Sequence, residues 1–113
     1  MKKVSEKICL DIEKTLAKHK AKDVIRIDLA NKSSMADFMI ICSGTSNRHV
    51  VALSNYVSER LKKKHSKKFS IEGRKNGDWI LLDIGDVIIH LFRVEVRSYY
   101  NLERMWQVDI NSI

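Results

Sequence analysis

Apolar residues recur along this chain at two spacings in turn, and this alternation narrows the possible folds more than any other feature. From the N-terminus they first return every four residues, which predicts an amphipathic helix over about residues 3–20. Between residues 25 and 29 they alternate with polar residues, which is typical of a half-buried strand. The residues that define the two patterns are Val4, Ile8, Ile12 and Leu16, then Ile25, Ile27 and Leu29.

Similar patterns mark the middle of the chain. Residues 37–42 form a more apolar run, which predicts a second, more buried strand. Small residues and helix N-cap formers at 43–47 then introduce a second helix. Its apolar residues are Val50, Leu53, Val57 and Leu61.

The C-terminal part has strand and turn signals. A short strand is expected at 69–71, and strands at 79–84 and 87–92 are expected to form a tight hairpin. A last helix is expected from about Ser98, with one face made by Tyr99, Leu102 and Trp106. The order helix, two strands, helix, three strands, helix predicts an α/β fold with a mixed β-sheet flanked by helices.

Length and composition fit one globular unit. A chain of 113 residues can bury one core but not two, so residues 1–113 are expected to form a single domain. No apolar run is long enough to span a bilayer, and the polar N-terminus does not look like a secretory signal. Cys9 and Cys42 are too few and too isolated for a disulfide scaffold or a zinc site. These features predict a cytoplasmic protein without a metal site.

The net charge of +7 is divided unevenly along the chain. Residues 1–77 have a formal charge of +10, whereas residues 78–113 have −3. The acidic third also holds both tryptophans and two of the three tyrosines: Trp79, Trp106, Tyr99 and Tyr100. Acidic groups orient a basic partner, and large rings supply contact area at a low entropic cost. The segment therefore predicts a surface that docks a basic protein.

The hairpin at 79–92 is the expected centre of that surface. Strand alternation puts Trp79 and Leu81 on one face, and Ile80 and Leu82 on the other, so both faces are apolar. One of the two faces could stay available for a partner. His90 interrupts the apolar strand, and it is either a hydrogen-bonded histidine within the sheet or part of a contact surface.

The densest run of positive charge extends from Arg60 to Lys68 and contains six cations and no acid. Such a run binds RNA phosphates when it is a functional site, and it is a solvated helix end when it is not. No sequence-reading RNA motif accompanies it, so both interpretations stay open at this stage.

The signs of catalysis are weak. The turn Ser43–Ser46 resembles a phosphate loop, and Asp37, Asp83 and Asp86 are acids that could hold magnesium in a nucleotidyl-transferring enzyme. Simpler readings are a capped strand-to-helix turn, with Ser46 or Asn47 as the cap, and turn aspartates that accept bonds from nearby backbone. The four histidines show no metal-ligand spacing.

Several of these segments together resemble the ribosomal silencing factor family, RsfS, also called Iojap-like proteins. The matching blocks run in order from about residue 23 to residue 107. They are Lys32-Ser33-Ser34 with Asp37, Ile40 to Val50 with its Ser-Gly-Thr-Ser-Asn-Arg-His core, Glu72-Gly73, Asp78-Trp79-Ile80, Asp83 to His90, and Tyr100, Leu102-Glu103 and Trp106.

The resemblance implies a bacterial translation repressor with a nucleotidyltransferase-like fold, often a homodimer. Such factors bind the large ribosomal subunit through ribosomal protein L-fourteen and block joining of the small subunit. The resemblance implies no enzyme activity, and no cofactor is expected. A nucleotidyltransferase-like enzyme and a general RNA-binding module are the alternatives.

On this hypothesis two sets of residues make the contacts. Those expected to bind the ribosomal protein are Trp79, Asp83, Ile84, Asp86, His90, Phe92, Tyr99 and Tyr100. Those for a possible contact with ribosomal RNA are Arg60, Lys62, Lys63, Lys64, Lys67 and Lys68.

Overall fold

The computed structural model describes residues 2–29, 36–65 and 68–100. Its helices and strands follow one another in the order expected from the sequence patterns. A five-residue π-helical segment, η1, is added at the end of the second helix. The elements are α1 (Lys2–Lys18), β1 (Lys22–Asp28), β2 (Phe38–Gly44), α2 (Asn47–Arg60), η1 (Leu61–His65), β3 (Ser70–Glu72), β4 (Trp79–Asp83), β5 (Val87–Arg93) and α3 (Val94–Tyr100).

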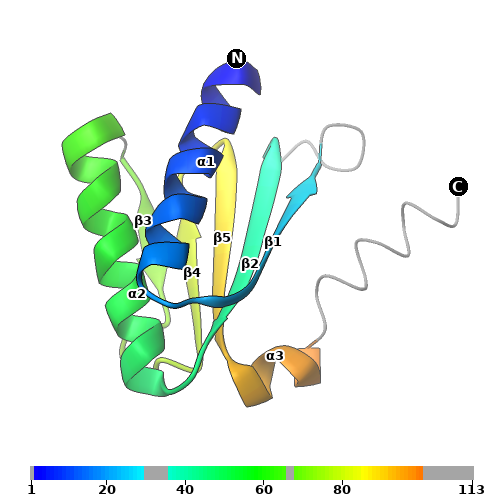
Figure 1. The fold of residues 1–113 in the computed structure, drawn as a ribbon, viewed down its shortest axis with the longest axis vertical. Coiled ribbons are helices and arrows are strands. Elements are labelled where there is room, and N and C mark those ends of the chain that lie inside the picture. Colours follow the sequence, from blue (N-terminus) through cyan, green and yellow to red (C-terminus); the bar gives the residue numbers. More distant parts are fainter. Residues whose placement is uncertain (1, 30–35, 66–67, 101–113) are drawn as a thin grey trace, which may run out of the picture.

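The five strands form one mixed sheet, as the sequence predicts. Their order is β1-β2-β5-β4-β3, in which β2 and β5 are parallel and the other neighbours are antiparallel. Helices α1 and α2 lie side by side over one face of the sheet, and α3 lies at one end of it (Figure 1). The fold class is therefore confirmed, whereas the likeness to nucleotidyltransferases stays a prediction.

Two apolar clusters lie on opposite faces of the sheet. The larger one fills the space between the sheet and the two long helices, where Ile12, Leu53 and Leu82 have no exposed surface. Each such side chain contributes about 1.5–3 kcal/mol when it is fully buried. The second cluster contains Ile41, Phe92 and, at its margin, Trp79. The expected division of the hairpin into two apolar faces is confirmed.

The last helix starts earlier than the expected position near Ser98. β5 pairs with β2 as far as Arg93, opposite Gly44, where β2 ends; α3 then begins at once at Val94. Arg97 is 8% exposed and donates hydrogen bonds to the carbonyl of Asp23 at 2.7 Å and to the hydroxyl of Ser43 at 3.0 Å. These bonds attach α3 to the ends of β1 and β2. The expected face with Leu102 and Trp106 lies outside the described residues.

The turn at 43–46 also differs from expectation. Ser43 and Gly44 belong to β2 and are buried, so this segment is not an open loop. Ser46 is the N-cap of α2, as predicted, and its side chain accepts a hydrogen bond from the backbone N–H of His49 at 3.1 Å. In the part of the chain that the structure describes, no helix combines the length and the apolar character needed to cross a bilayer.

Candidate docking site

Three ring side chains from β4 and β5 form the centre of the candidate site. The antiparallel register sets Trp79 opposite Phe92, with their ring centroids 5.0 Å apart, and the indole N–H of Trp79 donates a hydrogen bond to Nδ1 of His90 at 3.0 Å. Phe92 and His90 are buried, whereas Trp79 is half-buried. Trp79 is therefore the member of the trio that a partner can reach.

His90 acts as a structural acceptor in this trio. Burial lowers its pKa from 6.5 to about 4, so the imidazole is neutral at physiological pH. Its Nδ1 accepts the indole proton, and the orientation of the Trp79 ring is fixed in this way. Of the two interpretations left open by the sequence, the hydrogen-bonded histidine within the sheet is the one that the structure shows.

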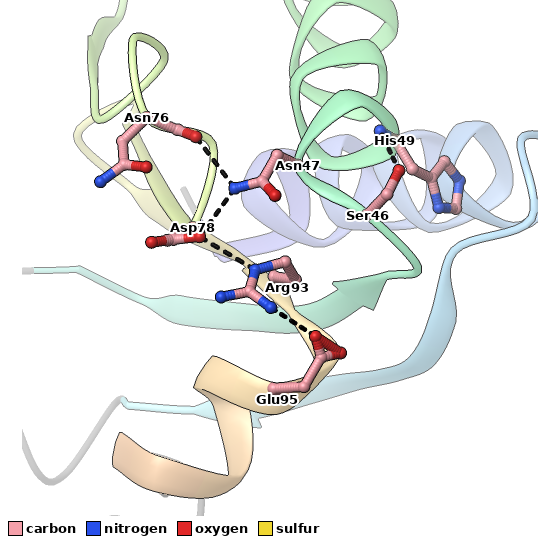
Figure 2. A network of polar contacts seen from close by, with 7 residues as sticks. All are labelled: Ser46, Asn47, His49, Asn76, Asp78, Arg93 and Glu95. Atoms are coloured by element: carbon pink, nitrogen blue, oxygen red, sulfur yellow. Dashed lines mark hydrogen bonds and ion pairs between the residues drawn. The ribbon is translucent and has the colours of Figure 1, made fainter.

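A polar network lies beside Trp79 and joins four segments of the chain. Figure 2 shows Asp78 between Asn47, the first residue of α2, and Arg93, the last residue of β5. Asp78 Oδ1 accepts hydrogen bonds from Asn47 Nδ2 at 2.7 Å and from Arg93 Nε at 2.9 Å. Asn47 also donates to the carbonyl of Asn76 at 3.0 Å, and Arg93 pairs with Glu95 of α3.

The network sets the charge of this surface. Hydrogen bonds from Arg93 and Asn47 hold the pKa of Asp78 below its usual value, so its carboxylate stays ionised. The backbone N–H of Arg93 donates to the carbonyl of Asp78 at 2.9 Å, which continues the pairing of the two strands beyond Trp79. The position of Trp79 is thus braced on the side nearest α3.

A groove of about 520 Å³ lies over this network, and a smaller one of about 310 Å³ adjoins it at Trp79. Gly73, which lines both, has a φ of +90°, and a Cβ there would lie 2.1 Å from the carbonyl oxygen of Trp79. Only glycine fits so close an approach. The larger groove is lined by Gly73, Asn76, Asp78, Trp79, Arg93, Glu95, Val96 and Tyr99, and the smaller one by Glu72, Gly73, Trp79 and Leu81.

The residues expected to bind the ribosomal protein fall into two places. Trp79 and Tyr99 line the groove, and Tyr99 is 83% exposed. Asp83, Ile84 and Asp86 form the turn at the far end of the hairpin, about 13 Å along β4 from Trp79. Tyr100 is the last residue of α3, and its side chain is outside the described ones.

At the hairpin turn, Asp83 has the simpler structure expected for the turn aspartates, in which the side chain accepts a hydrogen bond from nearby backbone. Asp83 Oδ1 accepts a hydrogen bond from the backbone N–H of Gly85 at 2.8 Å, and Gly85 has a φ of +95°. Ile84 is buried, whereas Asp83 and Asp86 are exposed. The turn is therefore an acidic edge whose apolar residue points into the protein.

The acids of the enzymatic alternative lie at the opposite end of β2 from its Ser43–Ser46 turn. Asp37 lies next to Asp86, and its backbone N–H donates to the Asp86 carbonyl at 2.8 Å. The segment Ser43–Ser46 follows the other end of β2, about 20 Å away. Among the described residues no three His, Cys, Asp or Glu side chains gather as they would around a metal ion.

The basic run has a partly fixed structure. Arg60 Nε donates to Asp11 Oδ1 at 2.8 Å, and His65 Nε2 lies 2.7 Å from Asp11 Oδ2, so this end of α2 and η1 is tied to α1. Burial alone would raise the pKa of Asp11, but the hydrogen bonds from His65 and Arg60 outweigh it and lower the pKa. Lys62, Lys63, Lys64 and Lys68 are exposed, and Lys67 lies outside the described residues.

Sequence reasoning did not find the polar residues that brace the groove. The sequence patterns indicate only a possible helix cap at Asn47, and they indicate no role for Asp78 or Arg93 in a binding site. The one signal for them was that the blocks of the family resemblance contain Asn47 and Asp78. Asn47 contacts Asp78 because α2 packs against the segment before β4, and no local sequence pattern predicts that packing.

Fold and groove together define an α/β protein with a mixed five-stranded sheet and an aromatic groove at one end of it. The family described as "Ribosomal silencing factor during starvation" matches residues 2–113. The chain belongs to this ribosomal silencing factor family.

Relatives and solved structures agree with this assignment. The chain is similar to the ribosomal silencing factor RsfS of Zymomonas mobilis, with 54% identity over 76% of this chain and 65% of that protein, just under two thirds of its length. A crystal structure of a Chromobacterium violaceum protein has a TM-score of 0.87 and 36% identity, over 90% of this chain and 85% of that one. A mouse protein named "Mitochondrial assembly of ribosomal large subunit protein 1" is 34% identical over 80% of this chain and 41% of its own length.

Proposed function

We propose that this protein represses translation by docking on the large ribosomal subunit and blocking the small subunit from joining it. The proposal combines membership of the ribosomal silencing factor family with a groove of the kind that a protein partner fills. The name of the mouse relative, which refers to the large ribosomal subunit, supports the choice of subunit. The activity is steric and involves no chemical step, and the place of action is the bacterial cytoplasm.

The partner on that subunit is ribosomal protein L-fourteen. The single observation that carries this part is the half-buried Trp79 in a groove whose lining holds two carboxylates, Asp78 and Glu95, against one cation, Arg93, which pairs with both. The exposed ring of Tyr99 lies at the margin of this groove. Ribosomal proteins are basic, and acids around an aromatic anchor favour a basic partner. His90 and Phe92 are buried and contact the Trp79 ring, and Asp83 and Asp86 form a separate acidic edge at the far end of the hairpin.

Sedimentation with separated ribosomal subunits tests this proposal. The protein should migrate with the large subunit, and large subunits loaded with it should fail to form 70S particles when small subunits are added. Migration with the small subunit alone, or with neither, would contradict the proposal. The expected homodimer is tested by sedimentation of the protein alone.

A nucleotide titration addresses the enzymatic alternative. If the protein bound nucleotide and magnesium, its thermal midpoint would rise with ligand concentration, because a ligand that binds only the native state stabilises it. The separation of Asp37 from Ser43–Ser46 leads us to expect no shift at millimolar nucleotide.

A further inference from the structure

A second groove lies between α1 and α2, and cations dominate its lining. One hollow of about 440 Å³ and another of about 500 Å³ adjoin there, because both are lined by Lys18, His19 and Tyr56. The cations of the two hollows are Lys14, Lys18, Lys20, Lys22, Arg60 and Lys63, and the acids are Asp11 and Glu59.

One of the two acids is already neutralised. Both carboxylate oxygens of Asp11 accept hydrogen bonds from Arg60, at 2.8 and 2.9 Å, and His65 contacts the same carboxylate. Among the residues that line the two hollows, Glu59 is then the one acid that opposes the five lysines. A polyanion in this groove would therefore meet a clear excess of positive charge.

An aromatic pair lies where the two hollows meet. The rings of His19 and Tyr56 are stacked, with centroids 3.4 Å apart and planes 4° apart, and Tyr56 is 41% exposed. His19 is half-buried, and because the two rings cover each other's inner faces, the outer face of the exposed Tyr56 ring is the one that a base can reach. An aromatic ring beside lysines is the arrangement on which proteins stack the bases of single-stranded nucleic acid. Lysines would be enough to bind an acidic protein, so the aromatic pair favours a nucleic acid as the ligand of this groove.

Backbone contacts hold this pair in place. His49 accepts a hydrogen bond at Nδ1 from the N–H of Thr45 at 2.9 Å, and its Nε2 donates to the carbonyl of His19 at 2.9 Å. The chain then turns at Lys20, whose φ is +66°. The end of α1 is thus fixed to the start of α2, and Lys18, His19 and Lys20 keep their places along the groove.

We propose that the groove between α1 and α2 binds single-stranded RNA, with phosphates on its lysines and a base against the His19–Tyr56 pair. The groove is on the helical side of the sheet, and Trp79 belongs to the apolar cluster of the other side. The RNA site is independent of the proposed docking surface. A protein held through Trp79 on one side could contact ribosomal RNA with the other.

Fluorescence anisotropy with a labelled ten-nucleotide RNA tests the proposal. Lys14→Gln with Lys18→Gln removes two cations from the groove, and Lys3→Gln with Lys7→Gln removes two from the same helix outside it. We expect the first pair to lower affinity about tenfold and to reduce the salt slope by about 1.4, and the second to do neither. Equal losses from both pairs would overturn the proposal, because they would show attraction by net charge alone.

A second pair of variants tests the stacking. Tyr56→Leu should lower affinity about fivefold or more, and Tyr56→Phe should preserve it, because the phenyl ring still stacks. Unchanged affinity in Tyr56→Leu, at an unchanged thermal midpoint, would contradict the site. Displacement of the RNA by polyglutamate of equal charge would also contradict the site, because it would show that the groove binds acidic proteins equally well.

One further variant separates this proposal from the proposed function. Trp79→Ala should bind the RNA with the affinity of the unmodified protein, whereas its binding to the large ribosomal subunit should be weakened. A loss of RNA binding in this variant would place the RNA on the docking surface and overturn the separate site.

Discussion

The indole N–H of Trp79 and Nδ1 of His90 form a hydrogen bond of 3.0 Å between two neighbouring strands. The acceptor is buried and the donor ring is half-buried, so the bond joins the interior of the second apolar cluster to the surface groove. A change at His90 is therefore expected to reach the groove without a direct contact to any partner.

The first prediction concerns Trp79 as the anchor of docking. Trp79→Ala should weaken binding to the large subunit by at least about 2 kcal/mol if Trp79 is a hot spot. Trp79→Phe keeps a ring above Phe92 but leaves Nδ1 of His90 without its donor, which should cost about 1–3 kcal/mol of stability. Binding is measured by sedimentation and stability by urea unfolding. A folded Trp79→Ala protein that still binds fully would exclude this anchor.

The second prediction is a loss of stability in mild acid. The pKa of His90 is about 4 in the native protein against 6.5 in the unfolded chain, so between these values the unfolded state binds the extra proton. Stability should accordingly fall as the pH is lowered from about 7 to 4, by at most about 3 kcal/mol from this group.

His90→Asn provides the matched comparison for this pH dependence. The Oδ1 atom of asparagine takes the place of Nδ1 as the acceptor for the Trp79 indole, and asparagine does not titrate. The difference in unfolding free energy between the two proteins should shrink as the pH falls toward 4. Parallel curves for both proteins over this range would show that His90 is not the group responsible.

The third prediction compares two glycines that share a positive φ. Gly73 and Gly85 have φ values of +90° and +95°, but a Cβ at Gly73 would meet the carbonyl of Trp79, whereas nothing lies within 4 Å of one at Gly85. Gly85→Ala should lower the free energy of unfolding by about 1 kcal/mol, through backbone strain alone. Gly73→Ala should lower it by clearly more and should also displace Trp79. Denaturant midpoints measure both, and equal costs would argue against the close approach.

The fourth prediction concerns the two thiols. Cys9 and Cys42 have no exposed surface, and burial raises the pKa of each from 9.0 to about 12. The thiolate fraction at pH 8 should therefore fall about a thousandfold relative to an ordinary cysteine. Iodoacetamide should leave the native protein unmodified and label two sites in urea, as counted by mass spectrometry. Rapid labelling of the native protein would contradict this burial.

The sequence by itself determined the order of the elements and the faces of the hairpin. Both follow from local geometry, because side chains return to one face every two residues in a strand and about every four in a helix. The family resemblance also came from the sequence alone. Trp79 and Tyr99, chosen as anchors from residue type and position, do line one groove.

Only the tertiary structure decided which distant residues meet. Asn47 reaches Asp78, and Asp11 reaches Arg60, because α2 packs against the segment before β4 and against α1. Helix α3 begins at Val94 because β2, the partner strand of β5, ends at Gly44, opposite Arg93. Such contacts depend on how whole elements pack against one another, and periodicity along the chain carries no record of that packing.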